Sequence, residues 1–236
     1  MSIFISKDTT RRLLKDVRQI IKEPLTDSGI HYVHDPEDML KGYALIIGQK
    51  DTPYYGGMFF FELVFTNDYP YKPPSITYYT NGYNIRFHPN LYRNGKVCLS
   101  LLNTWRGDQW TSCQTISSVL LTISSIFTED SLIHEPGITP SDPDVAIYNK
   151  IISYYTILVT CDIIKEKIKS NFFSMFKSIM NDYFRKNYSD MKKYIDNKIV
   201  MYPEERMYKT RVYHMNVVVD YNIALKAINT AYNSLK

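Results

Sequence analysis

The most informative segment of this 236-residue chain is residues 87–110, FHPNLYRNGKVCLSLLNTWRGDQW. It lies within residues 80–113, which have no long periodic run of apolar residues yet are rich in His, Asn, Cys and Trp. A long stretch without regular structure inside a compact domain is usually a functional loop. Since it brings His88, Asn90 and Cys98 close together in the sequence, we expect the chemistry of the protein to lie here.

Before this segment the sequence predicts one helix and then a β-sheet. Residues 7–22 place apolar side chains on one side and Lys or Arg on another, which is typical of an amphipathic helix, and Pro24 ends it. Short connections between the β-rich runs that follow favour a four-stranded antiparallel meander. These runs are IHYV, GYALIIG, MFFFELVF and SITYY.

Helical periodicity returns after the segment. Apolar side chains line one face of residues 114–127, and Ser112 is the predicted N-cap of this helix. We therefore predict an α+β fold, with a first domain at residues 1–145 and a helical C-terminal extension at residues 146–236. The stripes at helical spacing within the extension begin at Tyr148, Phe172 and Val218.

The composition argues against several classes of protein. Apolar residues make up 44% and charged residues 22%, which is typical of a globular chain rather than a disordered one. The net charge of +4 is too small to indicate nucleic-acid binding. The three cysteines show no CxxC spacing, which favours reduced thiols over a disulfide framework or a zinc site. With neither a signal peptide nor a membrane-spanning run, we expect a soluble intracellular protein, cytoplasmic or nuclear.

The order of the motifs resembles the ubiquitin-conjugating enzyme family. HPN at residues 88–90, followed by Cys98, is similar to the active-site signature of that family. The extra Trp105 and the long spacing from Cys98 to Trp110 resemble the large-enzyme subgroup that includes the Z type and the BRUCE/Apollon type. The resemblance is specific over residues 53–137. The other matching motifs are Gly56-Gly57, Pro73-Pro74 and Glu135-Pro136-Gly137.

The resemblance implies the ubiquitin-conjugating fold and a thioester of ubiquitin, or of a ubiquitin-like modifier, on Cys98. A cysteine thiolate is the side chain best suited to form such an activated ester. The Asn-Gly turn before Cys98 predicts that it lies at an exposed strand or loop edge. The alternative is a small buried apolar side chain, which is the usual fate of a free cysteine.

Three neighbours are expected to serve the transfer of the modifier to lysine. In the family, the residue matching Asn90 stabilises the oxyanion formed when lysine attacks the thioester, or orders the loop that does so. Glu135 stands where the family has an acidic residue that orients the lysine, and His134 is an alternative helper. His88 is expected to fix the loop rather than act as a base. Structurally, Asn90 could instead cap a turn, and Glu135 and His134 could belong to a solvated turn.

The resemblance also implies partner surfaces. Arg11, Arg12 and Lys15 match the helix face with which the family binds its activating enzyme, and a merely solvated face is the alternative. Tyr71 matches the position that contacts RING or HECT ligases. The chain departs from the family at residues 111–113, where Thr-Ser-Cys replaces the usual Ser-Pro-Ala, and this argues against a standard RING partner.

The resemblance implies no metal and no small cofactor, because ATP is used by the activating enzyme. The expected acceptors of the modifier are protein substrates. Neither nucleic acid nor membrane is an expected partner. One rival interpretation is a non-catalytic variant that binds ubiquitin or scaffolds a ligase, although such variants typically lack the cysteine. The other is a basic nucleic-acid-binding protein, which needs a continuous basic stripe with interleaved aromatic residues. Trp105 and Trp110 are expected to serve packing. Cys113 and Cys161 are expected in helical contexts, as core or helix-surface thiols.

Overall fold

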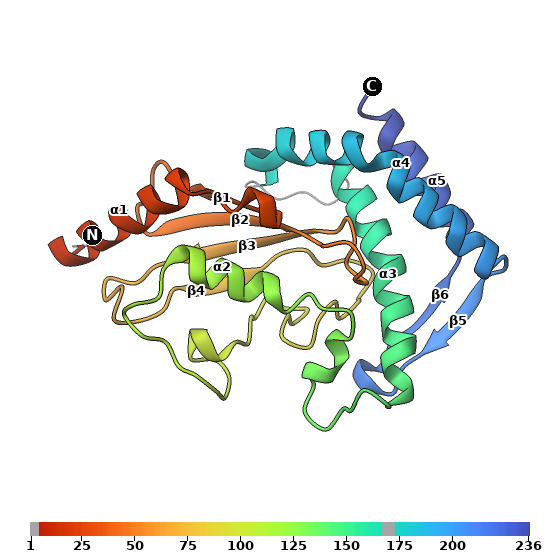
Figure 1. Ribbon diagram of the computed structural model, residues 1–236, viewed down its shortest axis with the longest axis horizontal. Helices are drawn as coiled ribbons and strands as arrows, with labels where there is room; N and C mark the ends of the chain where they lie inside the picture. Colours follow the sequence, from red (N-terminus) through yellow and green to blue (C-terminus); the bar gives the residue numbers. More distant parts are fainter. Residues whose placement is uncertain (1–4, 167–172) are drawn as a thin grey trace. The chain divides into compact units, whose positions relative to one another are not determined.

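The computed structural model describes residues 5–166 and 173–236 of the chain (Figure 1). The chain forms two compact units whose segments alternate along the sequence. The first unit is Met1–Ile46, Phe59–Tyr79 and Asn90–Ile126, and the second is Ile47–Met58, Thr80–Pro89 and Phe127–Lys236. This division does not test the domain boundary expected at residue 145, which stays a prediction.

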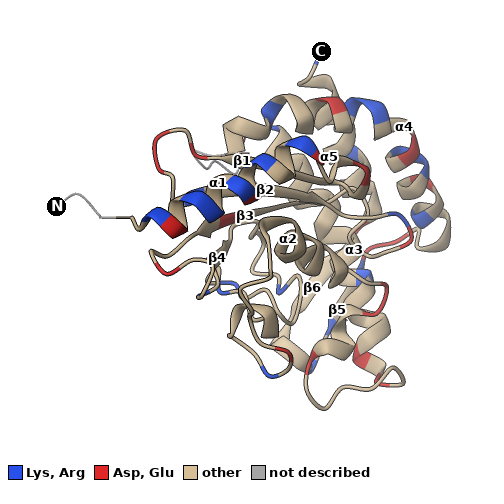
Figure 2. Cartoon of the chain, turned by 60° about the vertical axis from the view of Figure 1, so that its left-hand side comes forward, with Lys and Arg blue, Asp and Glu red and all other residues tan. Residues whose placement is uncertain are grey.

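The first unit begins with helix α1, Lys7–Lys22, and the bounds of this helix are those expected from the sequence. The side chain of Ser6 caps its first turn by accepting a hydrogen bond from the backbone N–H of Thr9. Leu13 and Ile20 are buried on its inner face. Figure 2 shows Lys and Arg residues in blue along the same helix. The amphipathic helix is therefore confirmed.

The four strands follow one another in the order β1-β2-β3-β4, so the expected meander is confirmed. Antiparallel pairing places His31 opposite Leu45 and Phe61 opposite Tyr78. The two central strands are almost continuously buried, which agrees with their mainly apolar sequences. The strands are β1 (Ile30–His34), β2 (Lys41–Ile47), β3 (Met58–Val64) and β4 (Ser75–Tyr78).

Helix α2, Ile116–Ser125, starts at Thr115 and not at Ser112, so the N-cap expected from the sequence is wrong. The Thr115 hydroxyl accepts from the backbone N–H of Ser118 at 3.2 Å, and the Ser118 hydroxyl accepts from the backbone N–H of Thr115 at 2.9 Å. This reciprocal pair satisfies two N–H groups that the first turn of a helix leaves without partners. Ser112 lies earlier, in a turn that the N–H of Gln114 closes on the carbonyl of Thr111.

Three long helices make up most of the C-terminal part of the second unit, which confirms the helical extension. They follow the expected periodicity because their apolar residues recur at helical spacing. No helix in the described parts of the chain combines the length and apolarity that a bilayer span needs. The helices are α3 (Pro143–Ile164), α4 (Lys177–Met201) and α5 (Tyr221–Asn233).

A two-stranded hairpin lies between α4 and α5 in the sequence, and the sequence patterns did not predict it. Its strands are β5 (Arg206–Lys209) and β6 (Asn216–Val219). Met207 lies opposite Val218, so the expected helical stripe is wrong at Val218. The helix starts later because the Asp220 side chain caps α5 by accepting from the N–H of Asn222. Phe172, where another stripe was expected to begin, lies outside the described residues.

Candidate active site

Asn90 and Cys98 are joined at the two ends of a short turn in the first unit. The backbone N–H of Cys98 donates to the carbonyl oxygen of Asn90 at 2.9 Å. The side-chain nitrogen Nδ2 of Asn90 donates back to the carbonyl oxygen of Cys98 at 2.5 Å. Between these ends, Leu91 and Val97 form an antiparallel bridge. Two residues expected to act in one reaction are therefore held against each other.

The turn between them depends on Gly95. Its φ of +91° lies in the left-handed region that favours glycine. Its N–H donates to the carbonyl of Tyr92 at 2.9 Å, and its own carbonyl accepts the N–H of Tyr78 at 2.8 Å. A Cβ atom at this position would lie 3.0 Å from both the Thr77 side chain and the Tyr78 carbonyl. The Asn-Gly turn is thus confirmed, and it is anchored on β4.

Cys98 is buried, with 2% of its surface exposed, so the expected exposed edge is wrong. The hydroxyl of Thr104 accepts from the N–H of Leu99 at 2.9 Å and donates to the carbonyl of Val97 at 3.0 Å. Thr104 therefore ties the backbone on both sides of Cys98.

The position of Asn90 agrees with one of its two expected roles. Its amide bonds to the carbonyl of Cys98, which orders the loop that carries the thiol. An amide nitrogen carries two N–H donors, so ordering this loop and donating to an oxyanion are compatible. The oxyanion role stays a prediction.

His88 lies in the second unit, where it is fully buried. Its ring centroid is 5.3 Å from that of His134, 6.1 Å from that of Phe127 and 6.3 Å from that of Tyr54. A ring enclosed by three others suits the structural role expected for His88, which stays a prediction.

Glu135 follows the short helix Ser131–His134 in the second unit and is half-buried. Its carboxylate accepts a hydrogen bond from the hydroxyl of Tyr213 at 2.5 Å. His134, next to it, is exposed as a whole residue, although its ring lies 5.3 Å from that of the buried His88. Glu135 has a partner from the C-terminal extension, and the helper roles of both residues stay predictions.

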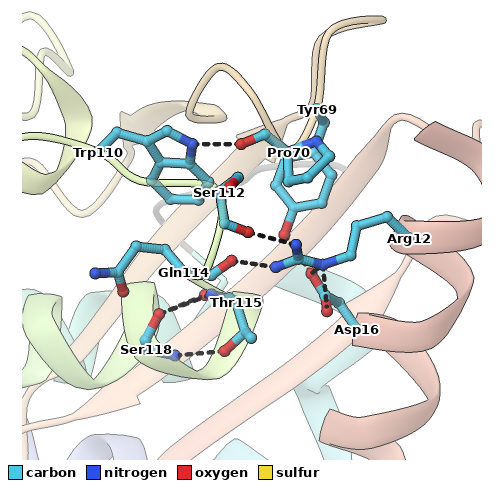
Figure 3. A network of polar contacts seen from close by, with 9 residues as sticks. All are labelled: Arg12, Asp16, Tyr69, Pro70, Trp110, Ser112, Gln114, Thr115 and Ser118. Carbon is cyan, nitrogen blue, oxygen red and sulfur yellow. Dashed lines mark hydrogen bonds and ion pairs between the residues drawn. The ribbon is translucent and has the colours of Figure 1, made fainter. Parts of the chain in front are cut away.

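The three basic residues expected to bind the activating enzyme differ in their surroundings. Arg11 and Lys15 are exposed on α1. Arg12 instead turns inward, where its Nε lies 3.0 Å from the carboxylate oxygens of Asp16. Its remaining nitrogens donate to the carbonyls of residues 112 and 114, as Figure 3 shows. Arg12 thus joins α1 to the start of α2, and contact with an activating enzyme stays a prediction for all three.

The aromatic residues expected to serve packing or partner binding differ in how far they are exposed. Trp110 is buried and donates its indole N–H to the carbonyl of Pro70 at 2.6 Å, so its packing role is confirmed (Figure 3). Trp105 is 42% exposed, so the packing role expected for it is wrong. It lies at the outer side of the loop, where Gln109 donates to its carbonyl at 3.2 Å. Tyr71 is exposed, as a ligase contact requires, and that contact stays a prediction.

The other two cysteines have contrasting surroundings. Cys113 is exposed in the turn before α2, so the helical context expected for it is wrong. Cys161 is buried within α3, as expected. Burial raises the pKa of the Cys161 thiol to about 12, because a thiolate is poorly solvated there. In residues 5–166 and 173–236, no three His, Cys, Asp or Glu side chains are grouped to hold a metal ion.

Sequence reasoning missed Arg86. This side chain is buried, with 8% of the residue exposed, in the second unit. Its Nε donates to the carbonyl of His88 at 3.0 Å and its Nη2 to the carbonyl of Pro89 at 2.6 Å. The signal in the sequence was an arginine between the apolar Ile85 and Phe87, directly before HPN. Such a residue needs an internal partner, because a charged group is rarely buried alone.

Comparison with known proteins gives a consistent result. The family model described as ubiquitin-conjugating enzyme matches residues 12–139. Ubiquitin-conjugating enzyme E2 Z of Danio rerio is 44% identical over 167 residues, which cover 69% of this chain and 50% of the relative. The E2 Z of Homo sapiens is 46% identical over 160 residues, or 66% of this chain and 45% of the relative. The chain thus spans about half the length of these relatives.

A relative with a different name matches over a shorter region. Probable ubiquitin-conjugating enzyme protein 17 of Caenorhabditis elegans is 40% identical over 140 residues, which cover 56% of this chain and 19% of the relative. The matched family region contains both Asn90 and Cys98. It ends before α3, so the family model does not extend over the C-terminal helices.

Proposed function

This chain belongs to the ubiquitin-conjugating enzyme family and is of the Z type, and from this premise we propose that it carries ubiquitin, or a ubiquitin-like modifier, as a thioester on Cys98. The observation that carries the proposal is the pair of hydrogen bonds holding Asn90 against Cys98. This pair supports the proposal because a shared reaction requires the proposed nucleophile and the amide of the family's signature to be held close together.

The first step is transfer from the activating enzyme. The Cys98 thiolate attacks the thioester carbonyl carbon, a new C–S bond forms, and the bond to the cysteine of the activating enzyme breaks. That cysteine leaves as a thiolate and takes up a proton equivalent to the one that Cys98 released. ATP is consumed by the activating enzyme, so this chain needs no metal or small cofactor of its own.

The second step transfers the modifier to a lysine of a protein substrate or to the cysteine of a ligase. The neutral lysine amine attacks the thioester, the C–N bond forms, and the Cys98 thiolate leaves while the amine loses its proton. Asn90 donates to the oxygen that becomes negative, a contribution of about 3 kcal/mol for one well-placed donor. Glu135 orients the amine and accepts its proton, directly or through water.

Access to the thiol requires a movement of the loop after it. Because Cys98 is 2% exposed, an incoming thioester cannot reach the sulfur until the chain opens. The bonds of Thr104 to the flanking residues Val97 and Leu99 tie the backbone on both sides of the thiol, and we expect the opening to break them. Local opening of an exposed loop has a smaller free-energy cost than global unfolding. Binding of the activating enzyme supplies this opening.

Partners and location follow from the family. Arg11 and Lys15, exposed on α1, bind the activating enzyme, and the exposed Tyr71 contacts a ligase. The reaction takes place inside the cell, in the cytoplasm or nucleus, where thiols remain reduced. The support for this location is that the cysteines of the described residues are free.

A charging assay tests the proposal. The chain is mixed with ATP and a panel of activating enzymes, each with its own modifier. At least one pair should give an adduct that a reductant removes. Cys98→Ser should give a reductant-resistant ester or no adduct, while Cys113→Ser should charge like the unaltered chain. A chain that binds ubiquitin but is charged by no pair would instead support the non-catalytic interpretation.

A further inference from the structure

We propose that Arg86 is a positioning residue for transfer of the modifier to lysine, and that Tyr213 of the C-terminal extension holds Arg86 in place. This inference rests on the proposed function, because it concerns the second step of that reaction. It assigns to the extension, which lies beyond the region matched by the family model, an effect on the rate of transfer.

The guanidinium of Arg86 fixes the backbone that leads into Asn90. It donates to the carbonyl of His88 at 3.0 Å and to that of Pro89 at 2.6 Å, and Asn90 follows Pro89 directly in the chain. The donors of a guanidinium lie in one rigid plane, so two bonds from it set the orientation of two successive peptide groups. The hydroxyl of Tyr148 donates to the carbonyl of Arg86 itself at 2.9 Å, which holds the backbone of Arg86 as well.

The charge of Arg86 is buried and must be compensated within the protein. The two carbonyl oxygens provide part of this compensation. The ring of Tyr213 provides another part, because the guanidinium carbon lies 5.1 Å from its centroid, within the range of a cation–π contact. Tyr213 therefore stabilises the side chain that stabilises the loop.

The backbone of Tyr213 is held in an uncommon conformation. Tyr213 has a φ of +62° and His214 one of +50°, a region that bulky residues rarely adopt. The Thr210 hydroxyl donates to the carbonyl of Val212 at 2.7 Å, and the N–H of Val212 donates to the side chain of Asp144 at 2.8 Å. Strained residues persist where the surrounding contacts determine their position. Here those contacts place the Tyr213 ring against Arg86.

Tyr213 also contacts the residue assigned to the incoming lysine. While its ring lies against Arg86, its hydroxyl donates to the carboxylate of Glu135 at 2.5 Å. One side chain of the extension is thus bonded to Glu135 and supports the backbone before Asn90. Glu135 and Asn90 both serve lysine attack in the proposed mechanism. The first step, charging by the activating enzyme, depends instead on the thiol of Cys98. The effect of Tyr213 should therefore fall on transfer and not on charging.

The test separates the two steps by single-turnover kinetics. Arg86→Lys keeps the charge but loses the planar fork, and Tyr213→Ala removes both the ring and the hydroxyl. Each variant should charge within about twofold of the unaltered chain. Each should discharge to free lysine about 10- to 100-fold more slowly, because small misplacements of catalytic groups cost rates of that order. Tyr213→Phe keeps the ring over Arg86 and should show a smaller loss.

Arg206→Lys is the matched control. Arg206, in the extension, also lies over a tyrosine ring, with its guanidinium carbon 5.3 Å from the ring centroid of Tyr202, but it is exposed. This variant should charge and discharge normally. In an Asn90→Ala background, Arg86→Lys should cause little further loss, because a positioning residue has no effect once its target is gone.

Several outcomes would overturn the inference. Charging and discharge that fall together with the thermal midpoint would show a merely structural role, and so would full additivity with Asn90→Ala. A normal discharge rate in Arg86→Lys would also contradict it. If the unaltered chain is never charged, the proposed function fails, and the transfer role with it. Hydrogen exchange over residues 87–98 then still tests whether Arg86 and Tyr213 hold this backbone in place. If they do, exchange should be faster in Arg86→Lys and Tyr213→Ala but not in Arg206→Lys.

Discussion

Two arginines, one in each compact unit, fix a loop in this chain, and they are supported in different ways. Arg12 is paired with Asp16, one turn further along α1, and reaches backbone carbonyls at the start of α2 (Figure 3). Arg86 has its carbonyl partners within three residues of itself, and its supporting ring, Tyr213, comes from the distant C-terminal extension.

The difference shows how the same guanidinium can be compensated in two ways. For Arg12 the charge is balanced by a carboxylate, and Asp16 has only 1% of its side chain exposed. Removing Arg12 therefore leaves a buried negative charge. Arg86 bonds to two carbonyl oxygens and lies over a ring face, and Arg86→Lys keeps the charge while it changes the geometry of these contacts. We therefore expect the contacts of Arg12 to affect mainly the free energy of unfolding. We expect the contacts of Arg86 to affect mainly the rate of transfer of the modifier.

The largest expected effect on stability is that of Arg12→Ala. It leaves the carboxylate of Asp16 buried with the Tyr69 hydroxyl as its remaining described donor, and such an uncompensated charge costs about 3–5 kcal/mol. The free energy of unfolding from urea denaturation measures this loss. Arg11→Ala, at an exposed neighbour, should change it by less than about 0.5 kcal/mol. Equal effects of the two variants would contradict the comparison.

Loss of a neutral hydrogen-bond donor next to Arg86 should lower the free energy of unfolding by less than Arg12→Ala does. Tyr148→Phe removes the hydroxyl that donates to the carbonyl of Arg86 at 2.9 Å, in a fully buried position. Leaving a buried acceptor without this donor costs about 1–3 kcal/mol. Tyr155→Phe is the control, since its hydroxyl makes a longer bond of 3.3 Å to the carbonyl of Val218. The same denaturation measurement should show the smaller loss for Tyr155→Phe.

A smaller effect is expected at the start of α2, where Thr115 acts through its side chain and Ser112 through its backbone carbonyl. Thr115→Ala removes the N-cap of α2 and should lower the free energy of unfolding by about 1 kcal/mol. Ser112→Ala should have almost no effect, because Ser112 provides Arg12 with its backbone carbonyl, which alanine keeps. Thermal or urea unfolding of both variants checks this. A larger loss of unfolding free energy in Ser112→Ala than in Thr115→Ala would contradict this assignment and indicate Ser112 as the N-cap.

The smallest effect concerns pH. Burial lowers the pKa of His31 and of His34 on β1 below the ordinary value of 6.5. Below pH 6.5 the unfolded chain therefore binds more protons at these positions than the folded chain does, so stability is lost as the pH falls through this range. Arg12 keeps its charge throughout. Unfolding at pH 7.5 and 5.5 should show this slope, and His31→Gln/His34→Gln should reduce it; an unchanged slope would contradict the assignment.

Sequence patterns predicted much of the first unit because its elements depend on nearby residues. Helix α1 has the expected bounds, and the turn through Gly95 brings Asn90 and Cys98 together as the motif implied. The cap of α2 was misplaced because serine and threonine both suit an N-cap, and only the reciprocal bonds of Thr115 with Ser118 decide between them. The exposure of Cys98 was wrong because the packing of the whole fold decides which side chains are buried, and the Asn-Gly turn before Cys98 does not.

Local spacing and residue type were thus enough to predict helix α1 and the meander, because these follow from residues that lie close together along the chain, where backbone geometry links position to structure. The order of the motifs indicated the family. The fold alone decided that Arg12 turns inward, that Cys98 is covered, and that Tyr213 reaches Arg86 and Glu135. These contacts join residues far apart in sequence, and no local pattern encodes which distant side chain will fill a given space.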